Sequence, residues 1–317
     1  MGHSSVRTFR RPTRIWRVLL AALVSVLICR CCSIRGAEER VLESEVTVRL
    51  NQPYRAGIRA CTLDIAVPNR HSARPRPAIV VIHGGGWIEG DKSSFVTETK
   101  RVPGNIRDFA KLGFVAAAIN YRLSREAAYP AGLDDCRCAI RWLRAHAKDF
   151  NIDPSRIGAY GNSAGAHLAL LLAIMPTISP KPGEPFPHES SAVQAAVSDS
   201  GPLDLLGQYK MGLLKQVIGT FMGGPPGDGR EAIYRQASPT SYVTAHGPPL
   251  LLIYGEADNQ VDVTSADRFV ADLSRAGRKD LTYLRLANVG HCPYSLIRVP
   301  YLRPVVDEFF LRTLGPQ

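Results

Sequence analysis

The segment Arg156-Ile-Gly-Ala-Tyr-Gly161-Asn-Ser163-Ala-Gly165-Ala-His-Leu-Ala-Leu170 joins an apolar strand-like run to an apolar helix-like run. A Gly-x-Ser-x-Gly at such a junction predicts a sharp turn that holds Ser163 in a strained backbone conformation, where side chains at positions 161 and 165 would collide with neighbouring backbone. The following helix would place its N-terminus beneath the hydroxyl and favour negative charge there. Ser163 is therefore the candidate nucleophile, and an ordinary strand–turn–helix corner is the alternative.

A second motif lies 80 residues earlier, where Ala78-Ile-Val-Val-Ile-His83 leads into Gly84-Gly-Gly86 and Trp87. A backbone without side chains can turn its amide N–H groups toward a bound oxygen, and Ala164, directly after Ser163, would add another donor. Together these groups predict an oxyanion hole. The alternative is a flexible surface turn, and His83 is expected to brace the loop instead of acting as a base.

A nucleophilic serine needs a base that is oriented by an acid. His291 follows the final strand-like run, whereas His167 falls on the helix after Ser163, where packing is the expected role. Asp258 follows the run before it and is the preferred acid; spacing alone leaves Glu256 and Asp262 open, with Asp204 as an outside choice. The chain order Ser163, Asp258, His291 is that of an α/β-hydrolase, and all three residues follow strand ends.

Outward from these motifs, strand-like and helix-like segments alternate from residue 44 onward, which predicts an α/β fold with a mostly parallel sheet and helices on both faces. The helical pattern at Thr264-x-x-Asp267 resembles a capping box that opens a helix over residues 265–276. Another helical pattern covers residues 133–147, and the last begins at Pro304. The expected strands are two alternating runs at 46–50 and 61–67, five continuous apolar runs at 78–82, 114–119, 157–160, 193–197 and 250–254, and an alternating run at 281–286.

Two excursions interrupt this alternation. Residues 176–191 carry five prolines, and residues 201–247 combine weak helical patterns with a glycine- and proline-rich stretch at 223–229. Long excursions of this kind are often loops that cover a site, so both are expected to act as loop or lid insertions within a single domain over residues 38–317.

The net charge of +11, from 39 basic and 28 acidic residues, is concentrated at the N-terminus. Residues 1–37 hold seven arginines and no acid, and five of the arginines precede the apolar run 18–29. This layout predicts a cleaved secretory signal peptide; an uncleaved N-terminal anchor is the alternative. Without it the charge is +4, from 32 basic and 28 acidic residues, so no nucleic-acid partner is expected.

The cysteines outside residues 1–37 show no metal-ligand spacing. They are expected to be free thiols or to form one disulfide: Cys61, Cys136, Cys138 and Cys292.

These motifs resemble the α/β-hydrolase superfamily, and more narrowly the carboxylesterases related to hormone-sensitive lipase and to the acetyl-xylan and feruloyl esterase-like group. The matching segments are His83-Gly-Gly-Gly-Trp87, Asn120-Tyr-Arg-Leu-Ser124, Asp135, Gly161-Asn-Ser-Ala-Gly165, Gly255-Glu-Ala-Asp258 and Gly290-His291. The resemblance implies an eight-stranded α/β-hydrolase fold, with Ser163 as nucleophile, His291 as base and Asp258 as acid. It also implies Gly85, Gly86 and Ala164 as oxyanion donors, and a structural Arg122–Asp135 pair.

The expected function is a serine carboxylesterase that forms an acyl-enzyme without a metal or organic cofactor. The larger lipase-like enzymes carry a substantial N-terminal cap, which the few residues between 37 and the first strand do not provide. An open site of this kind favours short-chain or carbohydrate-linked esters, carried by a small molecule or a polysaccharide outside the cytoplasm. The alternatives are a secreted serine peptidase, an arylformamidase of the same fold, and a catalytically silent binding module. A membrane contact is expected only if the N-terminal segment stays uncleaved.

Overall fold

The computed structural model describes residues 45–97, 102–227, 229–296, 299 and 301–315. Contacts divide the chain into two units, residues 1–45 and 46–317, and the fold described below is that of the second. The predicted signal peptide therefore lies outside the described residues. Among the helices described, none combines the length and apolar character that a membrane span requires.

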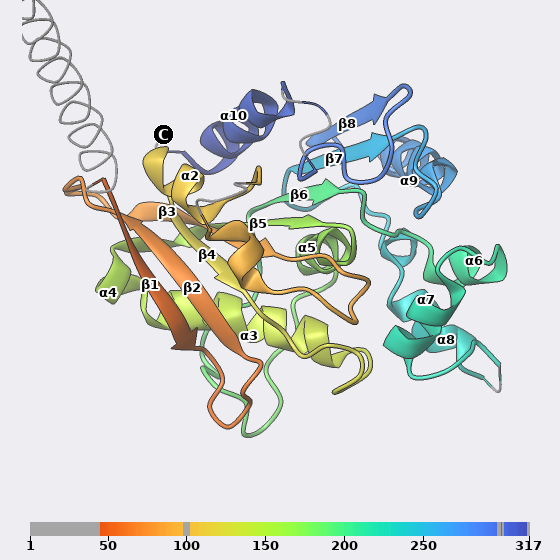
Figure 1. Ribbon diagram of the computed structural model, residues 1–317, viewed down its shortest axis with the longest axis horizontal. Coiled ribbons are helices and arrows are strands. Elements are labelled where there is room, and N and C mark those ends of the chain that lie inside the picture. Colours follow the sequence, from red (N-terminus) through yellow and green to blue (C-terminus); the bar gives the residue numbers. More distant parts are fainter. Residues whose placement is uncertain (1–44, 98–101, 228, 297–298, 300, 316–317) are drawn as a thin grey trace, which may run out of the picture. The chain divides into compact units, whose positions relative to one another are not determined.

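The second unit is built on one eight-stranded sheet with the strand order β1-β2-β4-β3-β5-β6-β7-β8 (Figure 1). The strands β1 and β2 pair antiparallel, as do β2 and β4, and all the other neighbours are parallel. This mostly parallel order confirms the predicted α/β-hydrolase architecture. The strands are β1 (Val46–Pro53), β2 (Thr62–Pro68), β3 (Arg76–Ile82), β4 (Val115–Ile119), β5 (Ile152–Asn162), β6 (Ala195–Asp199), β7 (Leu250–Gly255) and β8 (Leu281–Leu286).

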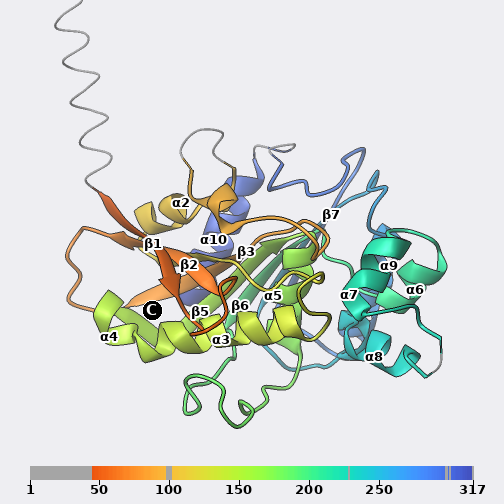
Figure 2. The same cartoon turned by 60° about the horizontal axis from the view of Figure 1, so that its bottom comes forward.

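Helices cover both faces of the sheet, and Figure 2 shows α2 and α10 on one side with α3 on the other. Along β3, Ala78, Val80 and Ile82 face the core that includes α3, α5 and α9, whereas Ile79 and Val81 face α2 and α10. Because the central strands are buried on both faces, they read as continuous apolar runs. The helices and short 3₁₀ turns are η1 (Lys92–Phe95), α2 (Ile106–Lys111), α3 (Ala131–Ala145), α4 (Ala147–Phe150), α5 (Ala164–Ile174), α6 (Leu205–Lys210), α7 (Lys215–Met222), α8 (Glu231–Gln236), η2 (Pro239–Ser241), α9 (Val263–Arg275) and α10 (Leu302–Leu314).

The predicted capping box at Thr264 is wrong by two residues. Helix α9 begins at Val263, and its N-cap is Asp262, whose carboxylate accepts from the N–H of Thr264 at 3.0 Å. An aspartate directly before the first apolar helical residue satisfies an orphan amide as well as a threonine does, so the cap lies two residues earlier.

The two excursions lie in different places. Residues 176–191 carry no helix or strand and pack against α3, where Arg141 contacts Glu184 at 3.1 Å and Phe186 meets the ring of His146. Arg144 also donates to the carbonyl of Pro154, near the start of β5. This excursion therefore runs along α3, from Asp134 near its start, which Lys181 contacts at 3.4 Å, to His146 at its end. None of these contacts reaches Ser163, Asp258 or His291, and the expectation that the excursion covers the site stays a prediction. Residues 201–247 fold into α6, α7, α8 and η2.

Candidate active site

Ser163 sits on the sharp turn that the sequence predicts. It lies between β5 and α5 with φ 52° and ψ −120°. A side chain at Gly161 would come within 2.3 Å of the Gly165 backbone, and one at Gly165 within 2.1 Å of the carbonyl oxygen of Ile82. Both distances are far below any real contact, so glycine is required at both positions. All residues of α5 are buried, which fixes the turn against the core.

The triple glycine lies directly against this turn. The N–H of Gly84 donates to Oδ1 of Asn162 at 2.9 Å, and a Cβ on Gly84 would lie 3.2 Å from the Cβ of Ser163. Gly85 and Gly86 have φ of 100° and 58°, conformations that L side chains rarely adopt. Within the described residues the amides of Gly85 and Gly86 donate to no acceptor.

His291 and Asp258 complete a continuous hydrogen-bonded chain. Nε2 of His291 lies 2.9 Å from Oγ of Ser163, and its Nδ1 lies 2.7 Å from Oδ2 of Asp258. The Asp258 side chain is fully buried, and its Oδ1 accepts from the N–H groups of Gln260 and Val261. Burial raises the pKa of this carboxyl, but the hydrogen bond and charge of His291 and the two amides outweigh it and hold the pKa below its ordinary value.

The other carboxylates considered as the acid are used elsewhere. Glu256 pairs with Arg285 at 2.8 Å, and Asp262 caps α9. Asp204 caps α6, where its Oδ1 accepts from the N–H of Gly207 at 2.9 Å. Of the four, only Asp258 contacts the imidazole of His291 among the described residues.

The two remaining histidines near the turn are packing groups. His83 is buried, donates from Nδ1 to the carbonyl of Gly84 and stacks on Tyr121 with ring centroids 4.5 Å apart. His167 is fully buried, and its Nε2 donates to the carbonyl of Ala237 at 2.7 Å. Burial lowers the pKa of both rings, that of His167 to about 4, so both stay neutral near neutral pH.

The Arg122–Asp135 pair that the resemblance implies is present in bidentate form. Nε and Nη2 of Arg122 contact the two carboxylate oxygens of Asp135 at 2.7 and 2.8 Å. Arg55, which the sequence does not single out, adds a third contact at 2.8 Å. Tyr121, the residue before Arg122, donates from its hydroxyl to the carbonyl of His83. The ion pair therefore supports the segment that leads into the glycine loop.

Two residues beside the site escaped the sequence analysis. Asp199 ends β6 and is fully buried, and Val217 on α7 places its Cγ1 2.7 Å from where a Cβ of Gly86 would be. A carboxylate at the carboxyl end of a buried strand is the signal that also points to Asp258, and it could have found Asp199. Nothing in the sequence places α7 over the glycine loop.

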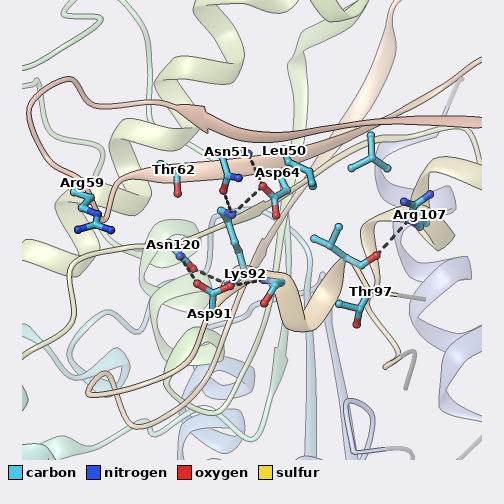
Figure 3. A pocket seen from close by; sticks show the side chains of 13 residues that line it. Leu50, Asn51, Arg59, Thr62, Asp64, Asp91, Lys92, Thr97, Arg107 and Asn120 are labelled. Carbon is cyan, nitrogen blue, oxygen red and sulfur yellow. Dashed lines mark hydrogen bonds and ion pairs between the residues drawn. The ribbon is translucent and has the colours of Figure 1, made fainter. Parts of the chain in front are cut away.

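A separate hollow of about 700 Å³ lies between the β1–β2 hairpin, η1 and the residue after β4 (Figure 3). Within it, Nζ of Lys92 contacts Asp64 at 2.9 Å and Asn51 at 2.8 Å, and Asp91 accepts from Asn120 at 2.6 Å. None of the candidate catalytic or oxyanion residues lines it.

The described part of the chain holds four cysteines, all of them free and buried: Cys61, Cys136, Cys138 and Cys292. Within the same residues, no three His, Cys, Asp or Glu side chains gather in a way that could hold a metal ion.

The sheet order and the turn at Ser163 are those of an α/β-hydrolase, and Ser163, His291 and Asp258 form one hydrogen-bonded chain. A comparison with protein families matches residues 63–273 to the BD-FAE family, and the chain belongs to this family. Among curated relatives, the esterase LipQ of Mycobacterium tuberculosis is 31% identical over 245 residues, which cover 75% of this chain and 56% of LipQ. The chain spans about half the length of the curated relatives it matches first.

Solved structures of similar size share the fold over nearly their whole length. A truncated carbohydrate esterase from gut microbiota superposes with a TM-score of 0.70 and 25% identity, covering 86% of this chain and 98% of that one. Esterase 2 of Thermogutta terrifontis with propionate bound gives a TM-score of 0.67 and 26% identity over 86% and 97% of the two chains. The same esterase phosphorylated by paraoxon matches with a TM-score of 0.66.

Proposed function

We propose that this protein is a serine carboxyl-ester hydrolase that works through an acyl-enzyme. The observation that carries the proposal is the unbroken chain from Oγ of Ser163 through His291 to the buried carboxylate of Asp258, with Gly84 of the glycine loop packed against Ser163. The relatives named as esterases support the same chemistry.

In this mechanism Oγ of Ser163 attacks the ester carbonyl while Nε2 of His291 takes its proton. Asp258 holds Nδ1 of the ring and stabilises the imidazolium. The developing oxyanion accepts from Gly85, Gly86 and Ala164, and each such donor typically contributes about 3 kcal/mol of transition-state stabilisation. His291 then protonates the leaving alcohol, and a water molecule that it activates releases the acid.

The proposed substrates carry short acyl groups on small alcohols or on carbohydrates. Val217 packs against Gly86, one of the proposed oxyanion donors, and a side chain at this position favours small acyl groups. Two similar proteins point the same way: esterase 2 was solved with propionate, and the other structure is a carbohydrate esterase. Neither a metal nor an organic cofactor takes part in the proposed reaction.

The test is the hydrolysis of p-nitrophenyl acetate by the wild type and by Ser163→Ala. We expect the variant to keep the wild-type circular dichroism spectrum and to lose at least ~10³-fold in kcat, because the nucleophile is gone. A fluorophosphonate probe should label the wild type at Ser163 and leave the variant unlabelled. Full activity in the variant would overturn the proposal, and an unlabelled, inactive wild type would favour a silent binding module.

The same panel separates the rival hydrolases. Butyryl, octanoyl and feruloyl esters and acetylated xylan report the acyl and alcohol preference. An aryl formamide reports arylformamidase activity, and an aminoacyl-proline reporter reports peptidase activity. Faster turnover of either of the last two than of every ester would replace the proposed reaction with that one.

We also propose that the protein is exported, on the basis of the basic and apolar pattern in residues 1–37. N-terminal sequencing of the protein recovered from outside the cytoplasm should show the loss of this segment. Recovery of the intact chain in the membrane fraction would favour an anchor.

A further inference from the structure

Asp199 lies where three parts of the candidate site meet. Its backbone carbonyl accepts from the N–H of Ser163 at 2.8 Å. Its carboxylate accepts from the N–H groups of Tyr294 at 3.3 Å and Ser295 at 2.8 Å, in the loop that carries His291. The one residue thus joins the turn of the nucleophile to the loop of the base.

Ser200, the next residue, extends this connection. Its Oγ accepts from the N–H of Cys292 at 3.1 Å, and its own N–H donates to the carbonyl of Ile253 on β7, the strand that leads to Asp258. Ser200 has φ 59°, an uncommon conformation for a residue with a side chain. Such strain persists only where the surrounding structure holds it in place.

The carboxylate of Asp199 is buried without an ordinary counter-ion. Its side chain is fully inside the protein, and no Lys or Arg pairs with it among the described residues. The groups that face it electrostatically are His291, Cys292 and Tyr294 from the loop, Tyr160 from β5 and Tyr254 from β7. Only His291 among them can carry a positive charge, and it does so when it accepts the proton of Ser163.

We propose, on the basis of the proposed function, that Asp199 is a positioning residue for the reaction. Its carboxylate fixes the loop of His291 against the turn of Ser163, and its negative charge favours the imidazolium that forms during acylation. Burial raises the pKa of this carboxyl to about 6 even though the two amides and His291 lower it, so the charge is present at neutral pH.

The test replaces Asp199 by asparagine, which keeps the shape and removes the charge. One amide oxygen can still accept from the loop, but the NH₂ group would face the second backbone N–H. We expect kcat for p-nitrophenyl acetate to fall about 10- to 100-fold, with KM changed less than about threefold, because substrate contacts are intact and the imidazolium loses support. The acid limb of kcat/KM should move to lower pH, because the imidazolium loses a neighbouring negative charge.

Two further variants make the result specific. Ser200→Ala removes only the acceptor for Cys292, and we expect a smaller fall in kcat at unchanged KM, which tests the same connection if Asp199→Asn does not fold. Asp64→Asn is the matched control, because Asp64 is a buried carboxylate paired with Lys92 away from His291. It should lower stability and leave kcat and the acid limb as in the wild type.

Folded Asp199→Asn and Ser200→Ala proteins with the wild-type kcat and acid limb would overturn the positioning role. A fall in kcat that Asp64→Asn shares, with the acid limb in place, would reduce Asp199 to a general structural residue and would also overturn it. A wild type that neither hydrolyses esters nor reacts with the fluorophosphonate probe would instead overturn the proposed function.

Discussion

Asp258 and Glu256 lie two residues apart, and their environments assign them different tasks. Asp258 is buried against His291 and is held ionised by two amides, whereas Glu256 is exposed and pairs with Arg285. An acid that orients a base must reach the imidazole in a dry environment, so burial and contact, not sequence spacing, distinguish the two carboxylates.

We expect Asp258→Asn to lower kcat by about 10⁴-fold with little change in KM, because the amide would favour the wrong tautomer of His291. Since the pKa of Asp258 lies below its ordinary value, its carboxylate stays ionised down to acidic pH, and mild acidification should not reproduce the effect of the substitution. Steady-state kinetics at several pH values measure both. The matched control is Glu256→Gln, expected to be fully active; the reverse outcome would assign the acid to Glu256.

Helix α7 packs against the glycine loop of the candidate site. Val217 lies over Gly86, and one turn later the ring of Phe221 stacks on Trp87 with centroids 4.2 Å apart. Residues four apart share one face of a helix, so α7 presents this face to the glycine loop. The second excursion of the sequence, residues 201–247, thus reaches the site through α7.

Substitution of Val217 should therefore change the length of acyl group that the enzyme prefers. Val217→Ala opens space beside Gly86, and we expect the ratio of kcat/KM for octanoyl over acetyl esters to rise about 5- to 20-fold, since each extra methylene that finds a pocket contributes about 1 kcal/mol or less. Val217→Phe should lower the same ratio. Thr220→Ala, on the exposed side of α7, is the control. Equal ratios in all three variants would place the acyl group elsewhere.

The ion pair of Arg122 with Asp135 joins the segment after β4 to α3. Its contribution to stability comes from the burial of the carboxylate. Asp135 is completely buried and contacts two arginines, Arg122 and Arg55. We expect Asp135→Asn to lower the free energy of unfolding by about 3 kcal/mol, because it leaves two partly buried guanidinium groups without the buried carboxylate that they contact. Urea unfolding measures this. The half-exposed pair Arg235–Glu231 should contribute little, and Arg235→Ala serves as the comparison; equal losses in both variants would contradict the argument.

Several elements could be predicted because their signals are local. The buried strands read as continuous apolar runs, and Ser163 follows one of them inside a pattern whose glycines have no substitute. Strand β5 begins at Ile152, five residues before the expected start. This early start could not be predicted, because Asp153-Pro-Ser-Arg156 is polar and lies at a register shift against β3. A polar segment that pairs irregularly has no apolar periodicity to reveal it.

At the scale of the whole molecule, the order of the strands along the sequence does not determine which strands are neighbours in the sheet. The contact of α7 with the glycine loop and the meeting of Asp199 with the loop of His291 join residues more than 90 positions apart. Such contacts depend on β6 lying between β5 and β7, which the sheet order supplies and a pattern in the sequence does not. The same limit applies to residues 176–191, whose prolines predict a loop but not that it packs along α3.

Asp199 also links the site to the stability of the whole molecule. Burial raises the pKa of this carboxyl to about 6, whereas an unfolded aspartate titrates near 3.9. At a pH between these two pKa values, the folded protein therefore still binds a proton that the unfolded chain has already released. The contribution of Asp199 to the free energy of unfolding is full below about pH 4 and is lost as the pH rises through about 6. At neutral pH the protein keeps a buried charge that lowers its stability, which fits a residue retained for the reaction.

Comparing urea unfolding of the wild type and Asp199→Asn at pH 4 and pH 7 isolates this contribution. Asparagine does not titrate, so the free energy of unfolding of the wild type minus that of the variant should fall by about 2 kcal/mol between the two pH values. Titrating groups that do not interact with Asp199 behave alike in both proteins and cancel in the difference. A difference that stays constant from pH 4 to pH 7 would mean that Asp199 ionises as it does in the unfolded chain, and that its charge has no cost to the fold.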